Sequence, residues 1–343
     1  MRVVLVGLGM VARTHIAAIQ GLEGQVVLHG VLARDAGRAE RFLEECLPDM
    51  TARPQIYTDV ADVAQDSDVD MVILATPPDA RVELVASLAG AGKHILMEKP
   101  IERDLQTATG IIASCEAANV ALGVCFQHRM RSDVARLKAH LESGAIGQLS
   151  HVDVRVPWWR DQSYYDAPGR GTYARDGGGV LMTQAIHSLD LTLMLAGPIS
   201  MVQAMQATTK AHTMEAEDWA AAAVEFRSGA VGSIMTTTAA FPGSEESLSF
   251  YGTKGAAHLR PGQLVLIDGH GQQEAHGSVA GSGGGADPMA FDSSWHRDLI
   301  ADFCNAVRTG TRPAVSGRDA LQVHALIDAM ARAARSGRRI ELS

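Results

Sequence analysis

The feature that most constrains the fold is the glycine pattern that follows the first apolar segment. Residues 3–6 form a short run of Val and Leu. Gly7-Leu8-Gly9-Met10-Val11-Ala12 comes directly after that run and directly before a helical pattern. In this arrangement Gly7 permits a tight turn, Gly9 lets a phosphate group approach the backbone, and Ala12 allows close packing of the helix. The N–H groups at the start of such a helix bind phosphate oxygens. The pattern predicts a dinucleotide site at Gly7, Gly9, Met10 and Val11, with an ordinary glycine turn as the alternative.

The rest of the first 125 residues alternates short apolar segments with longer stretches of helical spacing. This alternation is typical of a parallel sheet covered by crossover helices. Six strands are predicted, at residues 3–6, 26–32, 55–57, 71–75, 94–97 and 121–126, with helices that include 36–46, 80–91 and 105–118. We therefore expect an α/β fold that begins with a doubly wound Rossmann domain over residues 1–122.

The pattern changes after Gly147, where extended segments follow one another with few helices between them. They lie at residues 149–156, 201–209, 219–226, 231–238, 247–251 and 263–267. Tight turns such as Arg227-Ser228-Gly229 join neighbouring segments directly, and strands joined in this way pair antiparallel. We expect residues 123–343 to form a second α/β domain with a large, mainly antiparallel open sheet. Helices are expected at 180–195, 295–307 and 317–334, with the C-terminal helix packing back on the first domain.

One glycine-dense segment, residues 278–287, has the composition of a second phosphate site. It follows no strand, and no Gly-Lys-Ser/Thr comes after it. We expect a mobile surface loop there.

Charge and cysteine usage limit the partners. With 30 basic and 39 acidic side chains the formal net charge is −9, which opposes nonspecific binding to nucleic acid or an anionic membrane. The four cysteines lie far apart with no Cys-x-x-Cys pair, so neither a metal site nor a disulfide framework is expected. No apolar run approaches the roughly 20 residues of a membrane span, and Met1-Arg2 leads directly into the first strand. We expect a cytoplasmic protein that acts on a small molecule.

The end of the second predicted strand bears on the cofactor. An acidic residue at this place hydrogen-bonds the ribose 2′-hydroxyl of NAD, but here the strand ends Leu32-Ala33-Arg34-Asp35. The small Ala33 leaves room for a 2′-phosphate and Arg34 can pair with it, so the sequence mildly favours NADP over NAD. NAD remains an alternative, because Asp35 is an acidic residue next to this position. As a further alternative, Arg34 and Asp35 only open the next helix, with Asp35 as its N-cap.

Two more motifs stand at the ends of predicted strands. Ala75-Thr76-Pro77-Pro78 follows the fourth strand, and Met97-Glu98-Lys99-Pro100 follows the fifth. Ligands bind at the carboxyl ends of strands in a doubly wound sheet, so both motifs are expected beside the cofactor, and Lys99 is expected to meet a substrate. The alternative is that Lys99 is an ordinary surface lysine.

Further motifs accompany these. They are Gly-Val-Cys-Phe-Gln-His-Arg at 123–129, a triple glycine at 177–179 followed by His187-Ser188-Leu189-Asp190, and Tyr-Gly-Thr-Lys-Gly at 251–255. Taken together, the motifs make the chain resemble the Gfo/Idh/MocA oxidoreductases, the glucose-fructose oxidoreductase and inositol dehydrogenase group, over essentially its whole length. The resemblance implies pyridine-dinucleotide redox chemistry of sugars, cyclic polyols and their derivatives. It also implies a second domain whose open sheet often serves oligomerisation, so a homodimer or homotetramer is expected.

The resemblance also implies catalytic residues. In this family the lysine of Glu-Lys-Pro and a histidine after the triple glycine act at the reacting carbon, which corresponds to Lys99 and His187. The family commonly has an aspartate four residues before that histidine, where this chain has Thr183. Residues four apart share a face of a helix, so Thr183 is expected to line the pocket with His187, but a threonine cannot supply the negative charge that raises the basicity of a histidine. Proton transfer is then expected to depend more on Lys99 or on a water. Asp190 is either part of the pattern or a helix-surface acid.

Aromatic and guanidinium groups are concentrated in residues 157–173, although only 5% of the chain is aromatic. Flat apolar faces beside hydrogen-bonding groups suit sugar rings, and arginines can hold a carboxylate or phosphate. The residues expected to contact substrate are Gln127, Trp159, Arg160, Tyr164, Arg170, Thr183 and Gln184, together with Lys99 and His187. The segment is most similar to family members that oxidise nucleotide-linked amino sugars. For any single aromatic residue, buried packing is an equal alternative.

Three functions remain open. The leading one is an NAD(P)-dependent dehydrogenase or reductase of a sugar, cyclic polyol or sugar derivative. A second is a related glycosidase or lyase that retains its cofactor, which net nicotinamide turnover would exclude. A third is a non-catalytic dinucleotide sensor, which is disfavoured because Lys99 and His187 are both present.

Overall fold

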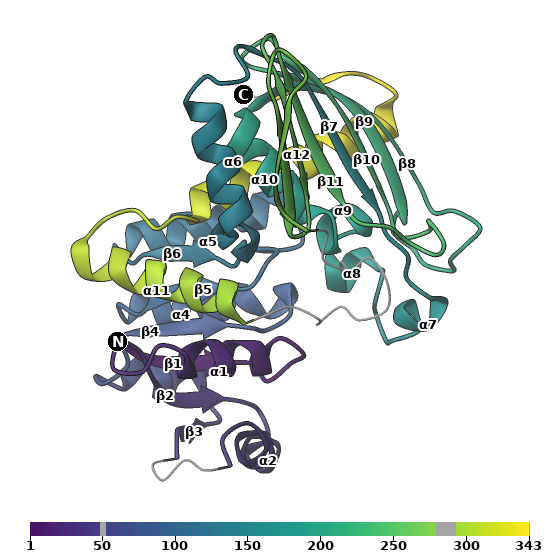
Figure 1. The fold of residues 1–343 in the computed structure, drawn as a ribbon. Coiled ribbons are helices and arrows are strands. Elements are labelled where there is room, and N and C mark those ends of the chain that lie inside the picture. The colour runs from purple at the N-terminus through teal and green to yellow at the C-terminus, as the bar shows by residue number, and fades with distance from the viewer. Residues whose placement is uncertain (49–52, 279–292, 343) are drawn as a thin grey trace. The chain divides into compact units, whose positions relative to one another are not determined.

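The computed structural model describes residues 1–48, 53–278 and 293–342. Its contacts divide the chain into two compact units (Figure 1). The first is Met1–Met130 with Phe291–Leu321, and the second is Arg131–Ala290 with Gln322–Ser343. The first unit extends past residue 122 because η2 (Gln127–Met130) and α11 (Ser294–Thr309) pack on each other within it. All but the first residue of the glycine-dense segment lies outside the described residues.

The first unit is built on a parallel six-stranded sheet in the order β3-β2-β1-β4-β5-β6. Its strands are β1 (Arg2–Val6), β2 (Val27–Leu32), β3 (Gln55–Tyr57), β4 (Met71–Leu74), β5 (His94–Met97) and β6 (Leu122–Val124). Its other helices are α1 (Ala12–Gln20), α2 (Ala36–Cys46), α3 (Val60–Gln65), η1 (Pro78–Ala80), α4 (Arg81–Gly90) and α5 (Leu105–Ala117). This is the strand order of a Rossmann sheet, so the doubly wound fold is confirmed.

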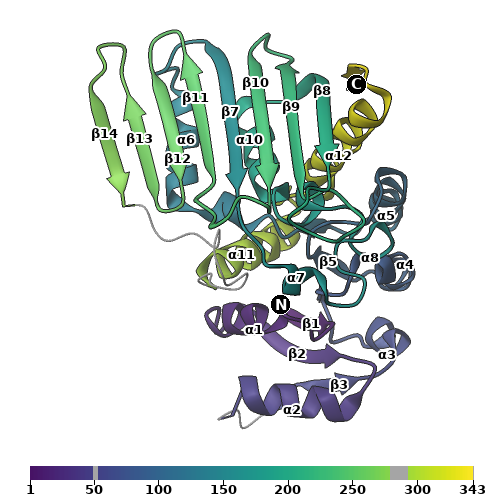
Figure 2. The same ribbon diagram turned by 90° about the vertical axis from the view of Figure 1, so that its right-hand side faces the viewer.

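Both faces of this sheet are covered. Every residue of β4 is buried, and so are the last four residues of β1, as a parallel sheet between two helix layers requires. Figure 2 shows α1 and α11 on one side of the strands and α3, α4 and α5 on the other. The strand order reverses between β1 and β4. The carboxyl ends of these two strands therefore form the crevice where such sheets bind ligands.

The second unit contains a nine-stranded sheet in the order β14-β13-β12-β11-β7-β10-β9-β8-β15. Its strands are β7 (Leu149–Pro157), β8 (Ile199–Ala207), β9 (Trp219–Phe226), β10 (Val231–Thr237), β11 (Ser247–Gly252), β12 (Ala256–Arg260), β13 (Gln263–Ile267), β14 (Gln273–Gly277) and β15 (Ile340–Glu341). The predicted, mainly antiparallel sheet is confirmed. One pair differs, because β7 and β10 run parallel. No hairpin joins these two strands, so nothing in the connection forces them to run in opposite directions.

Helices cover one face of this sheet. Figure 2 shows the strands in front of α6 (Ser132–Glu142), α10 (Ile186–Ala196) and α12 (Gly317–Ser336). Burial alternates along β9, where Ala220, Val224 and Phe226 are buried and Glu225 is exposed. The alternation shows that this face packs on the helices while the other face of the strand does not.

No single helix in the described part of the chain is both long enough and apolar enough to cross a membrane, and the one bent pair that meets the criteria together, Tyr173–Thr183 with Ile186–Ala196, breaks by 51°.

Candidate active site

The glycine loop lies between β1 and α1, at the crevice of the parallel sheet. Gly7 has φ +93°, and a Cβ atom there would lie 2.9 Å from Thr76 Cγ2. Gly9 differs, since the nearest described atom to a Cβ there is Ala75 O at 3.9 Å. The first turn of α1 carries no acidic side chain. Gly7 is therefore required by the backbone itself, whereas Gly9 leaves space in front of N–H groups that suit a phosphate.

A pocket of about 990 Å³ opens beside this loop, within the first unit. Its lining includes the predicted residues Gly7, Gly9, Ala33, Arg34, Thr76 and Pro77. Met10, Val11, Pro78, Glu98 and Lys99, also predicted for the cofactor, are not among the described residues that line it. Thr76 Oγ1 is buried and has no hydrogen-bond partner among the described residues. An open pocket with an unpartnered hydroxyl at a helix N-terminus fits a dinucleotide.

The end of β2 supplies cations to the same pocket. Asp35 caps α2 by accepting a hydrogen bond from Arg38 N at 3.1 Å, so the N-cap alternative holds for this residue. Arg34 is exposed, and its side chain makes no hydrogen bond or ion pair with any described residue. Arg38, which the sequence analysis did not identify, lines the pocket and donates to Leu8 O at 3.2 Å. Two guanidinium groups, of Arg34 and Arg38, therefore line this pocket.

Arg81 connects the ends of β4 and β5. It is only 1% exposed, and burial lowers its pKa to about 10. It donates to Thr76 O at 2.6 Å, and also to the main-chain oxygens of Glu98 and Pro100 on either side of Lys99. Sequence reasoning missed this residue, although an arginine at the start of a helix beside Thr-Pro-Pro was a visible signal. Arg81 therefore fixes the backbone on both sides of Lys99.

Gln127 lies in η2, just past β6. Its side chain is 5% exposed, and Oε1 has no hydrogen-bond partner among the described residues. A buried amide oxygen without a partner is costly, which makes Gln127 a suitable group for a ligand to contact.

In the second unit the predicted helix over 180–195 is wrong in one respect. It is interrupted at residues 184 and 185 and forms α9 (Val180–Thr183) and α10. Ala185 N donates to Val180 O at 2.8 Å, five residues back, which ends α9 in a wider turn. Thr183 and His187 therefore do not share a face of one helix. Thr183 Oγ1 instead donates to Gly179 O at 2.6 Å.

His187 lies in the first turn of α10 and is 8% exposed. Asp190, three residues later, is completely buried, so it is not a helix-surface acid.

The last residue of the triple glycine, Gly179, has to be glycine for a steric reason. A Cβ at Gly179 would lie 1.7 Å from Glu217 O, so only glycine fits against the backbone just before β9. Glu217 O accepts from Val180 N at 2.8 Å, and the Glu217 carboxylate accepts from Leu181 N at 3.2 Å. The close approach thus holds the start of α9 against the residues that precede β9.

Arginine and tyrosine side chains gather around α7 (Gln162–Tyr165). The Arg160 guanidinium lies 5.2 Å from the centre of the Trp158 ring and 5.9 Å from that of Tyr164. Arg170 lies 4.6 Å from the Tyr164 ring centre and donates to the Tyr164 hydroxyl at 3.0 Å. Gln184 Nε2 lies 3.4 Å from the same hydroxyl. The structure therefore brings together four of the predicted substrate residues.

The two arginines near Tyr164, Arg160 and Arg170, carry positive charge that described carboxylates do not fully neutralise. Burial lowers the pKa of Arg160 from its usual value. No described carboxylate lies within ion-pair distance of Arg170, although its Nε is buried. Trp159 packs apart from this group, edge-on to Phe241 and beside His212, so the ring that stacks on Arg160 is Trp158.

A buried histidine holds the start of this segment. His212 Nδ1 lies 2.8 Å from Asp218 Oδ2, and His212 Nε2 lies 2.8 Å from Arg160 O. Thr209 donates to both oxygens of the same carboxylate. The backbone at Arg160 is therefore fixed by a network that sequence reasoning did not find, since its members lie as far apart in the chain as Arg160 and Asp218.

The two units thus offer complementary chemistry. The first provides a glycine loop whose N–H groups suit a phosphate and a lysine on a fixed turn, and the second provides a histidine, two arginines and hydroxyl groups. Lys99 belongs to the first unit and His187 to the second. That both act on one substrate stays a prediction of the sequence.

Two family models match the chain. One, described as an oxidoreductase family with an NAD-binding Rossmann fold, matches residues 1–126. The other, described as the GFO/IDH/MocA C-terminal domain, matches residues 134–258.

Several proteins are similar to the chain over most of its length. The myo-inositol 2-dehydrogenase of Thermotoga maritima is 26% identical over 93% of this chain and 92% of that protein. The D-apiose dehydrogenase of Paraburkholderia graminis is 27% identical over 98% of this chain and 88% of its own. The crystal structure of the WlbA dehydrogenase from Bordetella pertussis, in complex with NADH and UDP-GlcNAcA, is 31% identical, covers 100% of this chain and 98% of its own, and superposes with a TM-score of 0.83.

Proposed function

Because the chain belongs to the GFO/IDH/MocA family of NAD-binding oxidoreductases, we propose that it oxidises a secondary alcohol, or reduces the matching ketone, of a sugar derivative that carries an anionic group. The related dehydrogenases act on sugars and cyclic polyols, which supports the sugar part of this proposal. The observation that carries the anionic part is the group formed by Arg160, Tyr164 and Arg170. It contains an arginine without a described carboxylate partner.

The dinucleotide supplies the hydride-accepting or hydride-donating ring when it is bound. The residues that would hold it are Gly7 and Gly9 at the phosphates and Thr76 and Pro77 at the crevice, all of which line the pocket. For the finer choice we propose a preference for NADP over NAD. Arg34 after β2, Arg38 in α2 and the small Ala33 in place of an acidic residue support this preference. Asp35 is already engaged as the cap of α2.

For proton transfer we propose His187 as the proton carrier and Lys99 as its electrostatic partner. A histidine side chain has an ordinary pKa of about 6.5, whereas a lysine near 10.4 stays cationic and polarises the substrate oxygen. In oxidation His187 accepts the hydroxyl proton of the substrate, and in reduction it returns that proton to the carbonyl oxygen. Thr183 and Gln184 serve as substrate or relay contacts.

Arginine at this place suits a carboxylate or phosphate, because its planar fork donates two parallel hydrogen bonds to two oxygens. The similar WlbA dehydrogenase was crystallised with UDP-GlcNAcA, a nucleotide-linked sugar with acidic groups. We therefore place nucleotide-linked uronic acids first among the substrates, and free uronic acids and sugar phosphates next.

A matched substrate screen tests this proposal. The protein is incubated with NAD or with NADP, and nicotinamide absorbance is followed with two matched pairs, UDP-GlcNAcA with UDP-GlcNAc and glucuronate with glucose, and with myo-inositol. The members of each pair differ by one carboxylate, and UDP-GlcNAc keeps the charged diphosphate. We expect net turnover with a carboxylate-bearing substrate, and a higher kcat/KM for it than for its partner without the carboxylate. Equal kcat/KM within both pairs would contradict the proposed recognition of a carboxylate. Bond cleavage without net turnover would favour a glycosidase or lyase, and binding without either reaction would favour a sensor.

We also propose a homodimer or homotetramer that forms through the nine-stranded sheet, in the cytoplasm. The face of the sheet away from the helices carries exposed apolar side chains, with Met205 69% and Val231 55% exposed. A row of such groups is a poor surface to leave in water. All four cysteines are free thiols, which suits a reducing compartment. Light scattering that shows a monomer at micromolar concentration would contradict the assembly.

A further inference from the structure

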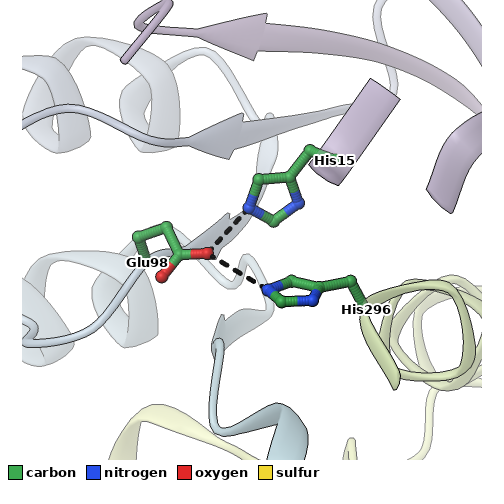
Figure 3. Close-up of side chains that lie close together, drawn as sticks. All are labelled: His15, Glu98 and His296. Carbon is green, nitrogen blue, oxygen red and sulfur yellow. Dashed lines mark hydrogen bonds and ion pairs between the residues drawn. The ribbon is translucent and has the colours of Figure 1, made fainter. Parts of the chain in front are cut away.

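A buried carboxylate and two histidines form a cluster at the turn that carries Lys99. Glu98 Oε1 lies 2.8 Å from His15 Nε2 and 3.8 Å from His296 Nε2 (Figure 3). The three side chains come from α1, from the end of β5 and from α11, and they are 0%, 8% and 2% exposed. The two imidazole rings meet edge to face, with centres 5.1 Å apart.

The partners of these groups indicate where the protons lie. Burial alone would raise the pKa of Glu98, but the hydrogen bond from His15 and the nearby His296 ring lower it well below its usual range. An ionised carboxylate only accepts hydrogen bonds, so each histidine presents an Nε2–H to it. Both Nδ1 atoms are buried and have no partner among the described residues. An unpaired lone pair costs less there than an unpaired N–H, so the contacts favour an Nε2–H that points toward Glu98 on each ring.

Two imidazoles and a carboxylate also match a metal ligand set, because the three ligand atoms lie within 4.8 Å of one another. A metal bound at Nε2 would move each ring proton to Nδ1. Metal-binding histidines usually donate that proton to a carboxylate or carbonyl oxygen. No described acceptor meets either Nδ1. The contacts therefore favour hydrogen bonding to an anion over metal binding.

The cluster acts on a backbone that is already restrained. Glu98 N donates to Leu74 O at 2.8 Å, and Arg81 holds the main-chain oxygens before and after Lys99. The Glu98 side chain, on the N-terminal side of Lys99, is held in turn by His15 and His296, and the Cys125 thiol also interacts with it. His15 also lies in the first turn of α1, three residues after Ala12, where the glycine loop ends.

From these contacts we propose that His15, Glu98 and His296 are positioning residues for Lys99. They tie the turn that bears Lys99 to the helix that begins at the phosphate-binding loop. The proposal rests on the proposed function of Lys99. It adds that three buried groups, none of which touches substrate, set the position of its side chain.

Four variants separate positioning from general stability. His15→Leu removes the donor, whereas His15→Gln returns an N–H near the place of Nε2. Glu98→Gln keeps the shape and removes the charge. The matched control is His94→Leu at the opposite end of β5, which loses the hydrogen bond that His94 Nδ1 accepts from Ala121 N at 3.0 Å.

The first readout does not depend on catalysis. Lys99 is labelled with acetic anhydride, and peptide mass spectrometry compares its rate with that of Lys138, whose side chain is 51% exposed on α6. We expect a several-fold change at Lys99 in His15→Leu and Glu98→Gln, recovery in His15→Gln, and no change in His94→Leu. The second readout is kcat, which should fall by roughly 10- to 100-fold in His15→Leu at unchanged NADH affinity, because a misplaced catalytic group costs about that much.

Unchanged Lys99 labelling and kcat in folded His15→Leu and Glu98→Gln would overturn the proposal. Elemental analysis that finds one metal ion per chain, lost in His15→Leu, would overturn it in favour of a metal centre. If Lys99→Ala keeps its kcat, the proposed function of Lys99 fails, and the labelling of Lys99 still decides whether the cluster positions it. If His15→Leu does not fold, Glu98→Gln and His296→Leu carry the same test.

Discussion

The two units hold their candidate residues by different kinds of contact. In the first, main-chain hydrogen bonds continue the sheet past the strand ends, as with Gly7 N to Leu32 O, Ala75 N to Val6 O and Glu98 N to Leu74 O. In the second, His187 lies on α10, and the other candidates lie on or next to short helices of four residues, namely α7, α8 (Tyr173–Asp176) and α9. There the side chains of Arg160, Tyr164, Arg170 and Gln184 hold one another.

This difference has a functional consequence. A site held by main-chain bonds keeps its geometry when side chains elsewhere change, which suits a constant cofactor. A site held by side chains changes with a few substitutions, which suits a substrate that differs among relatives. We therefore expect substitutions in the first unit to alter cofactor binding or kcat, and substitutions around α7 to alter substrate affinity and selectivity.

The largest effects are expected at Lys99 and His187, where substitutions in the two units should have the same effect rather than different ones. General acid–base groups contribute roughly 10²- to 10⁴-fold, so Lys99→Ala and His187→Ala should each lower kcat by at least about 10²-fold, although they lie in different units. Affinity for NADH, measured by fluorescence titration, should barely change. Exposed Lys138→Ala and His270→Ala are the matched controls. A His187→Ala enzyme with near-normal kcat would transfer the proton role to Lys99 or a water.

The next largest effect tests whether the glycine loop of the first unit binds the cofactor. Gly9→Val should abolish dinucleotide binding, by more than roughly 10²-fold, because the side chain would occupy the space of phosphate contacts that are each worth about 1.5–3 kcal/mol. Folding should be unaffected, since the nearest described atom to the added Cβ is 3.9 Å away. Calorimetric titration and melting temperature report the two quantities. Gly90→Val, also in open space, is the control, and undiminished NADP affinity in Gly9→Val would remove this loop from the site.

A smaller effect tests the second unit. Arg170→Met should raise KM for an acidic substrate by roughly 10- to 100-fold, the worth of one charge-assisted hydrogen bond, with little change in kcat. Cofactor affinity should stay the same. Arg175→Met, which removes a half-exposed arginine on α8, is the control. An equal rise in KM for the acidic and neutral partners would show that Arg170 supports the fold of the segment rather than the anion.

The smallest effect concerns the cofactor choice. Arg34→Ala should weaken NADP by about tenfold, because one charge-assisted contact to the 2′-phosphate is lost at an exposed position, and should leave NAD nearly unchanged. The ratio of the two dissociation constants is the measurement, repeated in Arg38→Ala. Equal losses for NADP and NAD would show that Arg34 does not contact the 2′-phosphate.

Much of the fold followed from local pattern. The strands at β3, β5 and β9 and the helix α2 begin and end where the sequence places them, because their apolar spacing and caps are local signals. The strands that the sequence analysis missed lack such local signals. The strands β12, β14 and β15 were not predicted, since β14 reads Gln-Glu-Ala-His-Gly and has no apolar alternation. Its pairing with β13 decides its conformation.

The candidate site divides in the same way. The glycine loop and the motifs after β4 and β5 were identifiable from the sequence, because a doubly wound sheet brings the carboxyl ends of its strands to one edge. The sequence by itself therefore determined the family, the cofactor fold and the residues at that edge. Only the tertiary structure decided the break at residues 184 and 185, the burial of Arg81 and the cluster of His15, Glu98 and His296. The reason is physical. These features depend on contacts between segments far apart in the chain, where packing and unpaired polar atoms, and not local periodicity, set the free energy.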